Sequence, residues 1–265
     1  MDSRNADIGL LTKPSNLSRD TLPKHLNKRT RLPSDTGCGR FASNPRSPHI
    51  KAPTALTPSS FQRGLGALVS RDPDLARVVD RYGPPPMWRR NPCFATLVRI
   101  ILEQQVSLAS ARAVYLRLAE LVVPFSAVRF RQMDEAHLKS AGLTRQKLAY
   151  CKHLAEAVAT QKLSLTRLNR LPDAEAHKAL VQMKGIGPWT ADIYLLMALR
   201  RPDIWPRGDL ALKAAVKAVK HLPALPSEER FDALGRAWRP WRAIAARVLW
   251  HFYLSSRNDK VTALF

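Results

Sequence analysis

The sequence of 265 residues has few cysteines and no long apolar run. Its three cysteines, Cys38, Cys93 and Cys151, are far apart and form no C-x-x-C pair. Their number and spacing exclude a disulfide scaffold, a thiolate zinc site and a four-cysteine iron–sulfur cluster, and they favour a reducing compartment. Because no apolar run reaches the ~18 residues that a transmembrane helix needs, we expect no membrane-spanning segment.

Acidic residues are scarce relative to basic ones. The chain has 43 Lys and Arg against 21 Asp and Glu, which gives a formal net charge of +22. Residues 1–60 hold ten Lys and Arg and four Asp, a charge of +6, which leaves +16 for residues 61–265. The imbalance indicates a polyanionic partner, with nucleic acid as the first candidate and an acidic membrane surface as the second.

Residues 1–60 contain no glutamate and show no sustained hydrophobic period. They are rich in Pro, Ser, Asn and Thr, a composition typical of a disordered basic tail. Their Arg and Ser content without Glu is also typical of an organellar transit peptide, so both interpretations stay open. The hydrophobic fraction of 45% excludes disorder of the whole chain, and we expect the folded domain over residues 61–265.

The folded part shows helical periodicity. Apolar residues recur at i, i+3, i+4 and i+7 from Phe94, which predicts a core-facing helix that ends near Gln104. Ser107 is the candidate N-cap of the next helix, which should reach about residue 121. Further helices are expected from near Phe61, over 133–140, 145–160 and 173–182, after Trp189, after Asp209, and over about 241–254. Without a period-2 strand or an internal repeat, the expected fold class is all-α.

The segment from Met183 to Asp192 holds two glycines on either side of one aliphatic residue. Gly185 and Gly187 can adopt positive φ and allow close approach of the backbone, and Pro188 suits the first turn of a following helix. The pattern predicts a tight hairpin whose N–H groups and helix N-terminus form a phosphate site. A plain helix–turn–helix corner is the alternative.

Asp209 follows a Gly/Pro loop and precedes an amphipathic helix. Aspartate is a favoured N-cap, which alone explains its presence there. A carboxylate at a helix N-terminus is also held ionised by the helix dipole and can stabilise a developing positive charge.

The hairpin and the Asp209 loop together resemble the helix-hairpin-helix DNA glycosylase superfamily, in its 3-methyladenine DNA glycosylase II branch. Three further stretches carry the resemblance, which covers about residues 62–256: residues 101–107, 142–147, and 238–242 continuing to Trp250. It implies a two-lobed helical core without an N-terminal β-domain, with the hairpin at 183–190. Double-stranded DNA with damaged bases should lie across the cleft between the lobes.

The resemblance implies a monofunctional glycosylase that flips an alkylated purine out of the duplex and hydrolyses its N-glycosidic bond, with no cofactor. Asp209 matches the family's catalytic aspartate. Trp189 stands where family members with strand-cutting activity have a lysine, so no lyase activity is expected. Two alternatives stay open: a non-catalytic DNA-binding module, and a bifunctional glycosylase/lyase. We expect a monomer located with DNA inside the cell, in a bacterial cytoplasm, a nucleus, or an organelle if the tail is a targeting segment.

Other positions receive roles from the resemblance. Trp189 and Trp250 match aromatic residues of the base pocket, where core packing is the alternative, and Ile193 stands where a relative has Tyr. Trp238 and Trp241 are expected to be structural. Gln105 matches the residue that fills the gap left by the flipped base, with a polar helix end as the alternative. DNA contacts are assigned to Gln104, Ser107, Arg145, Lys147 and Lys184, and to the backbone of Gly185, Ile186 and Gly187.

Three assignments leave alternatives. Lys184 and Arg242 are each either a phosphate contact or solvated. The turn from Thr144 to Lys147 is architectural, with phosphate contacts added by its basic residues. No metal site is expected from side chains, although the backbone of Gly185 and Gly187 could share its phosphate with a monovalent cation, as in relatives.

Overall fold

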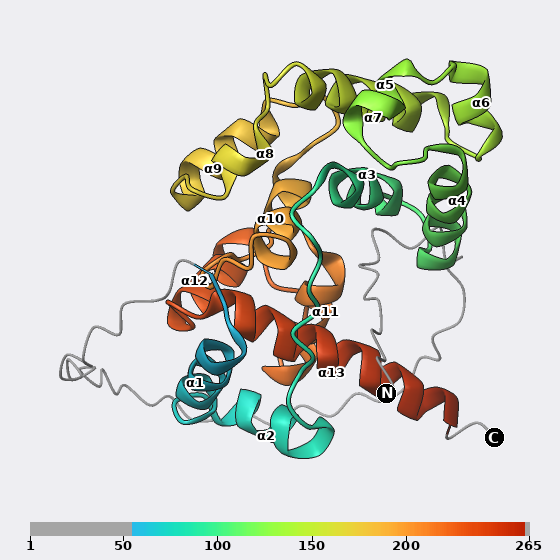
Figure 1. The fold of residues 1–265 in the computed structure, drawn as a ribbon. Coiled ribbons are helices and arrows are strands. Elements are labelled where there is room, and N and C mark those ends of the chain that lie inside the picture. The colour runs from blue at the N-terminus through green and yellow to red at the C-terminus, as the bar shows by residue number, and fades with distance from the viewer. Residues whose placement is uncertain (1–54, 263–265) are drawn as a thin grey trace, which may run out of the picture. The chain divides into compact units, whose positions relative to one another are not determined.

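The computed structural model describes residues 55–262, which form thirteen helices and no strand (Figure 1). The predicted all-α class is confirmed. The helices are α1 (Pro58–Val69), α2 (Pro73–Tyr82), α3 (Phe94–Glu103), α4 (Leu108–Leu121), α5 (Ala127–Gln132), α6 (Glu135–Ser140), α7 (Arg145–Ala159), α8 (Leu165–Leu168), α9 (Asp173–Val181), α10 (Pro188–Met197), α11 (Leu210–Val219), α12 (Glu228–Ala237) and α13 (Arg242–Thr262).

The predicted helix starts agree closely with the structure. Ser107 caps α4, because its Oγ accepts the Ser110 N–H at 3.2 Å. Thr144 caps α7 in the same way, and Pro188 is the first residue of α10. The first helix begins at Pro58, three residues before the expected boundary at Phe61, because Thr57 and Ser60 form a capping box. Most of the predicted tail lies outside the described residues.

The helical stretch expected from near Phe61 is divided into α1 and α2, because Asp72 caps a new helix with Pro73 as its first residue. Three further helices were not predicted. The helices α5 and α8, of six and four residues, are too short to show a hydrophobic period. The helix α12 is longer, and its start carries a recognisable signal: Ser227 accepts the Arg230 N–H, and Glu228 and Glu229 occupy the first turn. The sequence therefore contained a sign of α12 that periodicity alone did not reveal.

The helices form two lobes. In one lobe, α1, α2, α11 and α13 pack on each other, and in the other, α3, α4, α5, α6 and α7 do so. The chain crosses from α2 to α3 through residues 83–93, visible in Figure 1 as a long extended segment. The helix α10 packs on α3 and α9, and the chain then returns to α11.

Buried charged groups hold the segments between the lobes. The Arg247 guanidinium, which is fully buried in α13, donates to the carbonyls of Met87 in the crossing segment and Leu196 in α10, both at 2.9 Å. Burial lowers the pKa of Arg247 to about 9. The buried Glu103 at the end of α3 pairs with Arg90 through two bonds of 2.9 Å. These bonds fix the C-terminal end of α3, which borders the candidate site, and the C-terminal end of α10, which lies at the opposite end of that helix from the site.

The two tryptophans expected to be structural lie in the core. Trp238 and Trp241 are each 2% exposed. The Trp238 indole N–H donates to Asp72 at 2.7 Å, and Lys220 of α11 donates to both oxygens of the same carboxylate. This network joins the start of α2 to α11 and to the segment after α12, so the structural interpretation is confirmed.

Candidate functional site

The loop from Pro202 to Asp209 is fixed at several points. Arg242 donates to Asp203 at 2.8 Å, and the Trp205 ring stacks on Phe231 with centroids 4.6 Å apart. Arg207 forms an ion pair with Asp232 of α12 at 2.8 Å. Neither alternative predicted for Arg242 describes it, because its guanidinium is engaged by Asp203. These contacts hold the loop that places Asp209 at the start of α11.

Asp209 lies between two indoles. Its side chain caps α11, with Oδ1 accepting the Leu212 N–H at 2.7 Å. The Trp189 indole N–H donates to Oδ2 at 3.0 Å, and the Trp250 indole N–H donates to Oδ1 at 3.4 Å. The structure therefore brings together three residues from α10, α11 and α13 that the sequence placed far apart.

The Asp209 carboxylate is 2% exposed. Burial raises the pKa of Asp209, and hydrogen bonds from Trp189, Leu212 and Trp250 oppose that rise. These donors stabilise the charged form, although burial remains the larger influence on the pKa.

The glycine hairpin has two different glycines. Gly185 has φ +87°, and a Cβ at this position would lie 2.2 Å from the Tyr150 ring. Gly187 has φ −84° and ψ 175°, and a Cβ there would meet no atom within 4 Å. Gly185 therefore uses the positive φ that glycine permits, whereas Gly187 does not; Gly187 is the N-cap of α10 and leaves open space for an external group. Ile186 is 3% exposed, and its backbone N–H donates to the Met183 carbonyl at 3.0 Å, so its predicted DNA contact stays a prediction.

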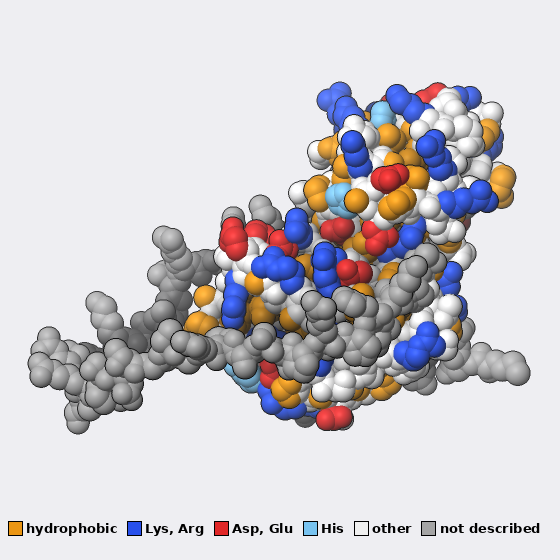
Figure 2. Space-filling view, turned by 90° about the vertical axis from the view of Figure 1, so that its left-hand side faces the viewer, with side chains coloured by type: hydrophobic (Ala, Val, Ile, Leu, Met, Phe, Trp, Pro, Cys, Tyr) orange, Lys and Arg blue, Asp and Glu red, His pale blue; other side chains and the backbone are white. Residues whose placement is uncertain are grey.

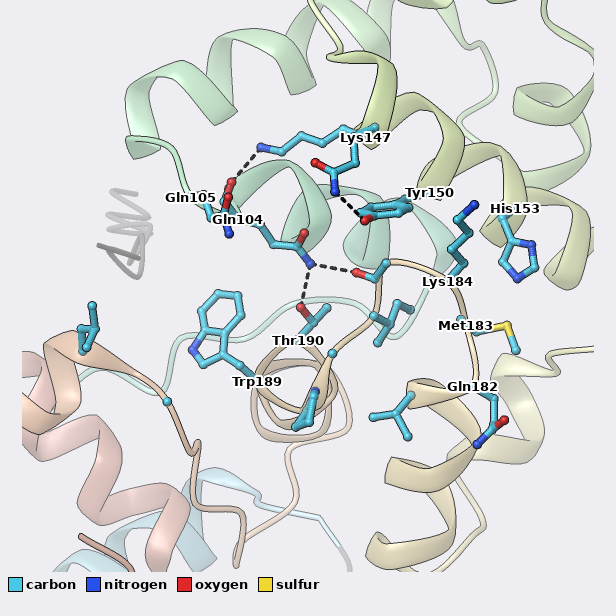
Figure 3. A pocket seen from close by; sticks show the side chains of 18 residues that line it. Gln104, Gln105, Lys147, Tyr150, His153, Gln182, Met183, Lys184, Trp189 and Thr190 are labelled. Atoms are coloured by element: carbon cyan, nitrogen blue, oxygen red, sulfur yellow. Dashed lines mark hydrogen bonds between the residues drawn. The ribbon is translucent and has the colours of Figure 1, made fainter. Parts of the chain in front are cut away.

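A groove of about 870 Å³ runs across the hairpin (Figure 3). Trp189 and Gly208 line one end, and Tyr150 and His153 of α7 line the other. Asp209 does not line the groove, although its neighbours Gly208 and Leu210 do. The complete lining is Gln104, Gln105, Gln146, Lys147, Tyr150, His153, Val181, Gln182, Met183, Lys184, Gly185, Ile186, Gly187, Pro188, Trp189, Thr190, Gly208 and Leu210.

Two side chains predicted as DNA contacts bond within the protein. The Gln104 amide donates to the Gly185 carbonyl at 3.0 Å and to the Thr190 hydroxyl at 2.8 Å, as Figure 3 shows. The Lys147 ammonium donates to the carbonyls of Gln104 at 2.9 Å and Leu102 at 2.5 Å. Both residues therefore join the end of α3 to neighbouring elements, Gln104 to the hairpin and Lys147 to α7.

The remaining predicted DNA contacts are exposed. Gln105 has φ +57° and lies at the groove, in the turn between α3 and α4. Lys184 is exposed on the hairpin, and Arg145 is exposed at the first position of α7. Ser107 is exposed and serves as the N-cap described above. Of these four residues, Gln105 and Lys184 line the groove, and Ser107 and Arg145 do not.

Ile193 and Trp250 lie deeper than Trp189. Ile193 is fully buried and does not line the groove, and Trp250 is 1% exposed. Trp189 is half-buried and lines the groove. Of the three predicted pocket residues, Trp189 is therefore the one at the groove surface, while Trp250 lies behind it against Asp209 and Ile193 belongs to the core.

Sequence reasoning missed Thr190, Tyr150 and Asp192. Thr190 lies inside the recognised motif, but its bond to Gln104 joins residues 86 positions apart. The Asp192 carboxylate on α10 lies 3.5 Å from His177 of α9. Burial raises the pKa of Asp192 to about 7. A charged residue one turn after Trp189 gave no sign in the sequence that it would be buried.

Metal-binding potential is limited in the described part of the chain. Among these residues, no group of three or more His, Cys, Asp or Glu side chains is placed to hold a metal ion. At the hairpin, the Gly185 carbonyl accepts from Gln104 and the Gly187 carbonyl accepts the Ala191 N–H at 3.0 Å. Each oxygen has a second lone pair, so a monovalent cation at this backbone stays a prediction.

Figure 2 shows how charge is distributed on one face of the molecule. Lys and Arg side chains are spread over the described part of this face, with acidic side chains between them. Within residues 55–262, no helix combines the length and the apolar content that a bilayer crossing demands.

Comparison with known proteins places the chain in a family. Residues 98–240 match the HhH-GPD superfamily of base excision DNA repair proteins, and the chain belongs to this family. The predicted resemblance is confirmed.

Individual relatives agree with this assignment. The chain is 26% identical over 202 residues to DNA-3-methyladenine glycosylase 1 of Schizosaccharomyces pombe, covering 74% of this chain and 87% of that protein. It is 30% identical over 168 residues to DNA-3-methyladenine glycosylase 2 of Escherichia coli, covering 58% and 55%. A structure of the S. pombe 3-methyladenine DNA glycosylase in complex with abasic DNA superposes with a TM-score of 0.65 and 26% identity, covering 71% of this chain and 95% of that one.

Proposed function

We propose that this protein is a monofunctional DNA glycosylase of base excision repair that releases alkylated purines of the 3-methyladenine and 7-methylguanine type. The observation that carries the proposal is the buried Asp209 carboxylate, which is held by two indole N–H groups behind one end of the groove. Family membership and the names of the relatives support the same reaction.

The chemistry follows from the charges involved. In an N-alkylated purine the base is cationic, so it departs with the bonding electrons as a neutral leaving group. The sugar carbon gains oxocarbenium character, which the Asp209 carboxylate stabilises across a dry site. Water then adds to that carbon and loses a proton, which leaves an abasic site. The Trp189 face, at the groove surface, attracts the cationic base more strongly than an uncharged one.

The hairpin is the proposed DNA clamp. Gly187 caps α10 in open space, so a phosphate can approach the backbone N–H groups and the helix N-terminus closely. Lys184 adds a positive charge beside it, and Gln105 lies where it can fill the gap left by a flipped nucleotide. The catalytic core on this proposal is residues 61–265, acting as a monomer on double-stranded DNA.

The Asp209→Asn substitution tests the catalytic assignment. Asparagine keeps an oxygen for the helix cap and removes the charge, so we expect excision of 3-methyladenine or 7-methylguanine to slow by about 100-fold or more. The measurement is release of free base from methylated duplex DNA in single-turnover reactions. Asp134→Asn is the matched control, because Asp134 caps α6 with its carboxylate and does not line the groove.

The test separates the proposed enzyme from its alternatives. Equal rates for wild type and Asp209→Asn would overturn the catalytic role while leaving the cap intact. A wild-type protein that binds duplex DNA without releasing base would indicate a binding module. Covalent trapping by borohydride would indicate lyase activity, which we do not expect because Trp189 supplies no amine.

A further inference from the structure

The two edges of the Trp189 side chain face different surroundings. Part of the side chain lines the groove, while its N–H edge donates to Oδ2 of Asp209 at 3.0 Å. Asp209 is 2% exposed, yet the residues on either side of it line the groove. The Trp189 indole therefore contacts the carboxylate on the side of Asp209 that is closest to the groove.

The bond to Trp189 is one of three that Asp209 accepts through its side chain. The Leu212 N–H belongs to the helix cap and would be present in any capping aspartate. The Trp250 N–H lies at 3.4 Å, a long distance for a hydrogen bond. The Trp189 N–H is thus the short donor that capping does not explain, and it is the donor to Oδ2.

We propose that Trp189 is a positioning residue for Asp209. Its indole N–H orients the carboxylate through Oδ2 and favours the ionised form, while its ring forms a wall of the groove. This inference rests on the proposed function, because that function makes Asp209 the reacting carboxylate. It assigns the indole a task that phenylalanine could not perform, although phenylalanine would provide a similar aromatic face.

The electrostatic argument is direct. Burial favours the protonated form of Asp209 and raises its pKa, and the Trp189 hydrogen bond is the first of the opposing causes. The groups that face the carboxylate are the Trp189 indole of α10, the Trp250 indole of α13, and the backbone N–H groups of Ala211 and Leu212 in α11. None of these groups titrates, so the opposition to burial comes from neutral donors, and the pKa of Asp209 stays above its ordinary value.

The test compares Trp189→Phe with wild type. Phenylalanine keeps an aromatic wall and removes the donor, so the pKa of the Asp209 carboxyl should rise by about one pH unit. The carboxyl signal of Asp209 in free protein labelled with ¹³C-aspartate gives this pKa without reference to activity. In excision assays, the fall of kcat/KM on the acidic side should move to higher pH by the same amount, because kcat/KM reports the free enzyme.

Two control variants accompany the measurement. Trp205→Phe removes a buried indole N–H that has no hydrogen-bond partner in the described structure, so it should leave the Asp209 pKa unchanged. Trp250→Phe removes the longer bond and should raise the pKa by less than Trp189→Phe does. Affinity for duplex DNA with an abasic site should change less than about threefold in Trp189→Phe, because a phenyl ring still lines the groove.

The outcomes are distinguishable from those of the proposed function. The positioning role would be overturned if Trp189→Phe and wild type had the same Asp209 pKa and the same fall of kcat/KM on the acidic side. This holds even if wild type releases alkylated bases normally. A rise in the Asp209 pKa confined to Trp189→Phe and, to a smaller extent, Trp250→Phe supports the role. If Trp189→Phe shows this rise and wild type releases no base, the proposed function is contradicted while the effect of the hydrogen bond on Asp209 is established.

Discussion

Asp192 and Asp209 are two shielded carboxylates with different surroundings: Asp209 is 2% exposed, and the Asp192 side chain is 13% exposed. Asp209 accepts three hydrogen bonds through its side chain, whereas Asp192 faces His177 at 3.5 Å. Burial is the largest influence on the pKa of each, and it raises both. Hydrogen bonds oppose the rise at both residues: Asp209 accepts from two indoles and from the backbone of α11, and Asp192 accepts a backbone hydrogen bond from Arg207.

The raised pKa of Asp192, about 7, makes stability depend on pH. Between pH 4 and pH 7 the folded protein keeps a proton that the unfolded chain has released, so this residue lowers stability as pH rises through that window. We expect wild type to lose up to about 3 kcal/mol more than Asp192→Asn between pH 5 and pH 8. Urea denaturation at the two pH values measures the difference.

Asp80→Asn, on the exposed side of α2, is the control for this stability measurement. It should follow wild type at both pH values, because an exposed carboxylate exchanges one solvated state for another. Identical pH dependence in Asp192→Asn and wild type would contradict the assignment of a proton to Asp192 in the folded state.

At the scale of a single element, the hairpin shows why its two glycines are not equivalent. Gly185 combines positive φ with a close approach to Tyr150, so an added methyl group would be strained and would clash. Gly187 has an ordinary extended backbone and open space around it. The first glycine is required by the fold, and the second leaves room for something outside the chain.

Substitutions at the two glycines should therefore separate stability from DNA binding. We expect Gly185→Ala to lower the free energy of unfolding by about 3 kcal/mol, from backbone strain and overpacking. Gly187→Val should cost less than about 1 kcal/mol and weaken binding to lesion-containing and undamaged duplexes alike. Thermal unfolding and fluorescence anisotropy check the two effects, and a Gly187→Val protein with unchanged affinity would remove the hairpin from the DNA interface.

Elements were predictable where the pattern is local. The starts of α4 and α11 follow from Ser107 and Asp209, and the hairpin follows from the order of Gly185 and Pro188. The partners of Gln104 and Lys147 were not, because both side chains appear as polar residues near helix ends and bond to atoms 43 to 86 positions away. The backbone torsion angles of the two hairpin glycines could not be predicted either, because glycine permits positive φ without requiring it.

At the scale of the whole molecule, the all-α class and the two lobes could be predicted from the sequence. The burial of Asp209 was visible only in the structure. The net charge of +22 and the ordered series of motifs were sufficient for the family. The burial of Asp209 behind Trp189 depends on how α10, α11 and α13 meet, which no local pattern records. The prediction of Ile193 at the pocket shows the same limit, because a family position does not determine whether a side chain faces the groove or the core.

The net charge of +22 should make DNA binding strongly dependent on salt concentration. We expect log Kd to rise linearly with log salt concentration, with a slope of about 0.9 for each phosphate that the protein neutralises on duplex DNA. Titrations of undamaged duplex between low and physiological salt measure this slope. Lys184→Ala should reduce it by about one phosphate, and a Kd that does not respond to salt would contradict the meaning given to the net charge.

The position of Trp189 as the second residue of α10, two after the N-cap Gly187, has a mechanical consequence. On the proposed function, the backbone that contacts the DNA strand and the indole that contacts the base belong to the same turn of one helix, so the distance between them is fixed. A substitution at Trp189 could then change which damaged base is recognised without moving the backbone at Gly187.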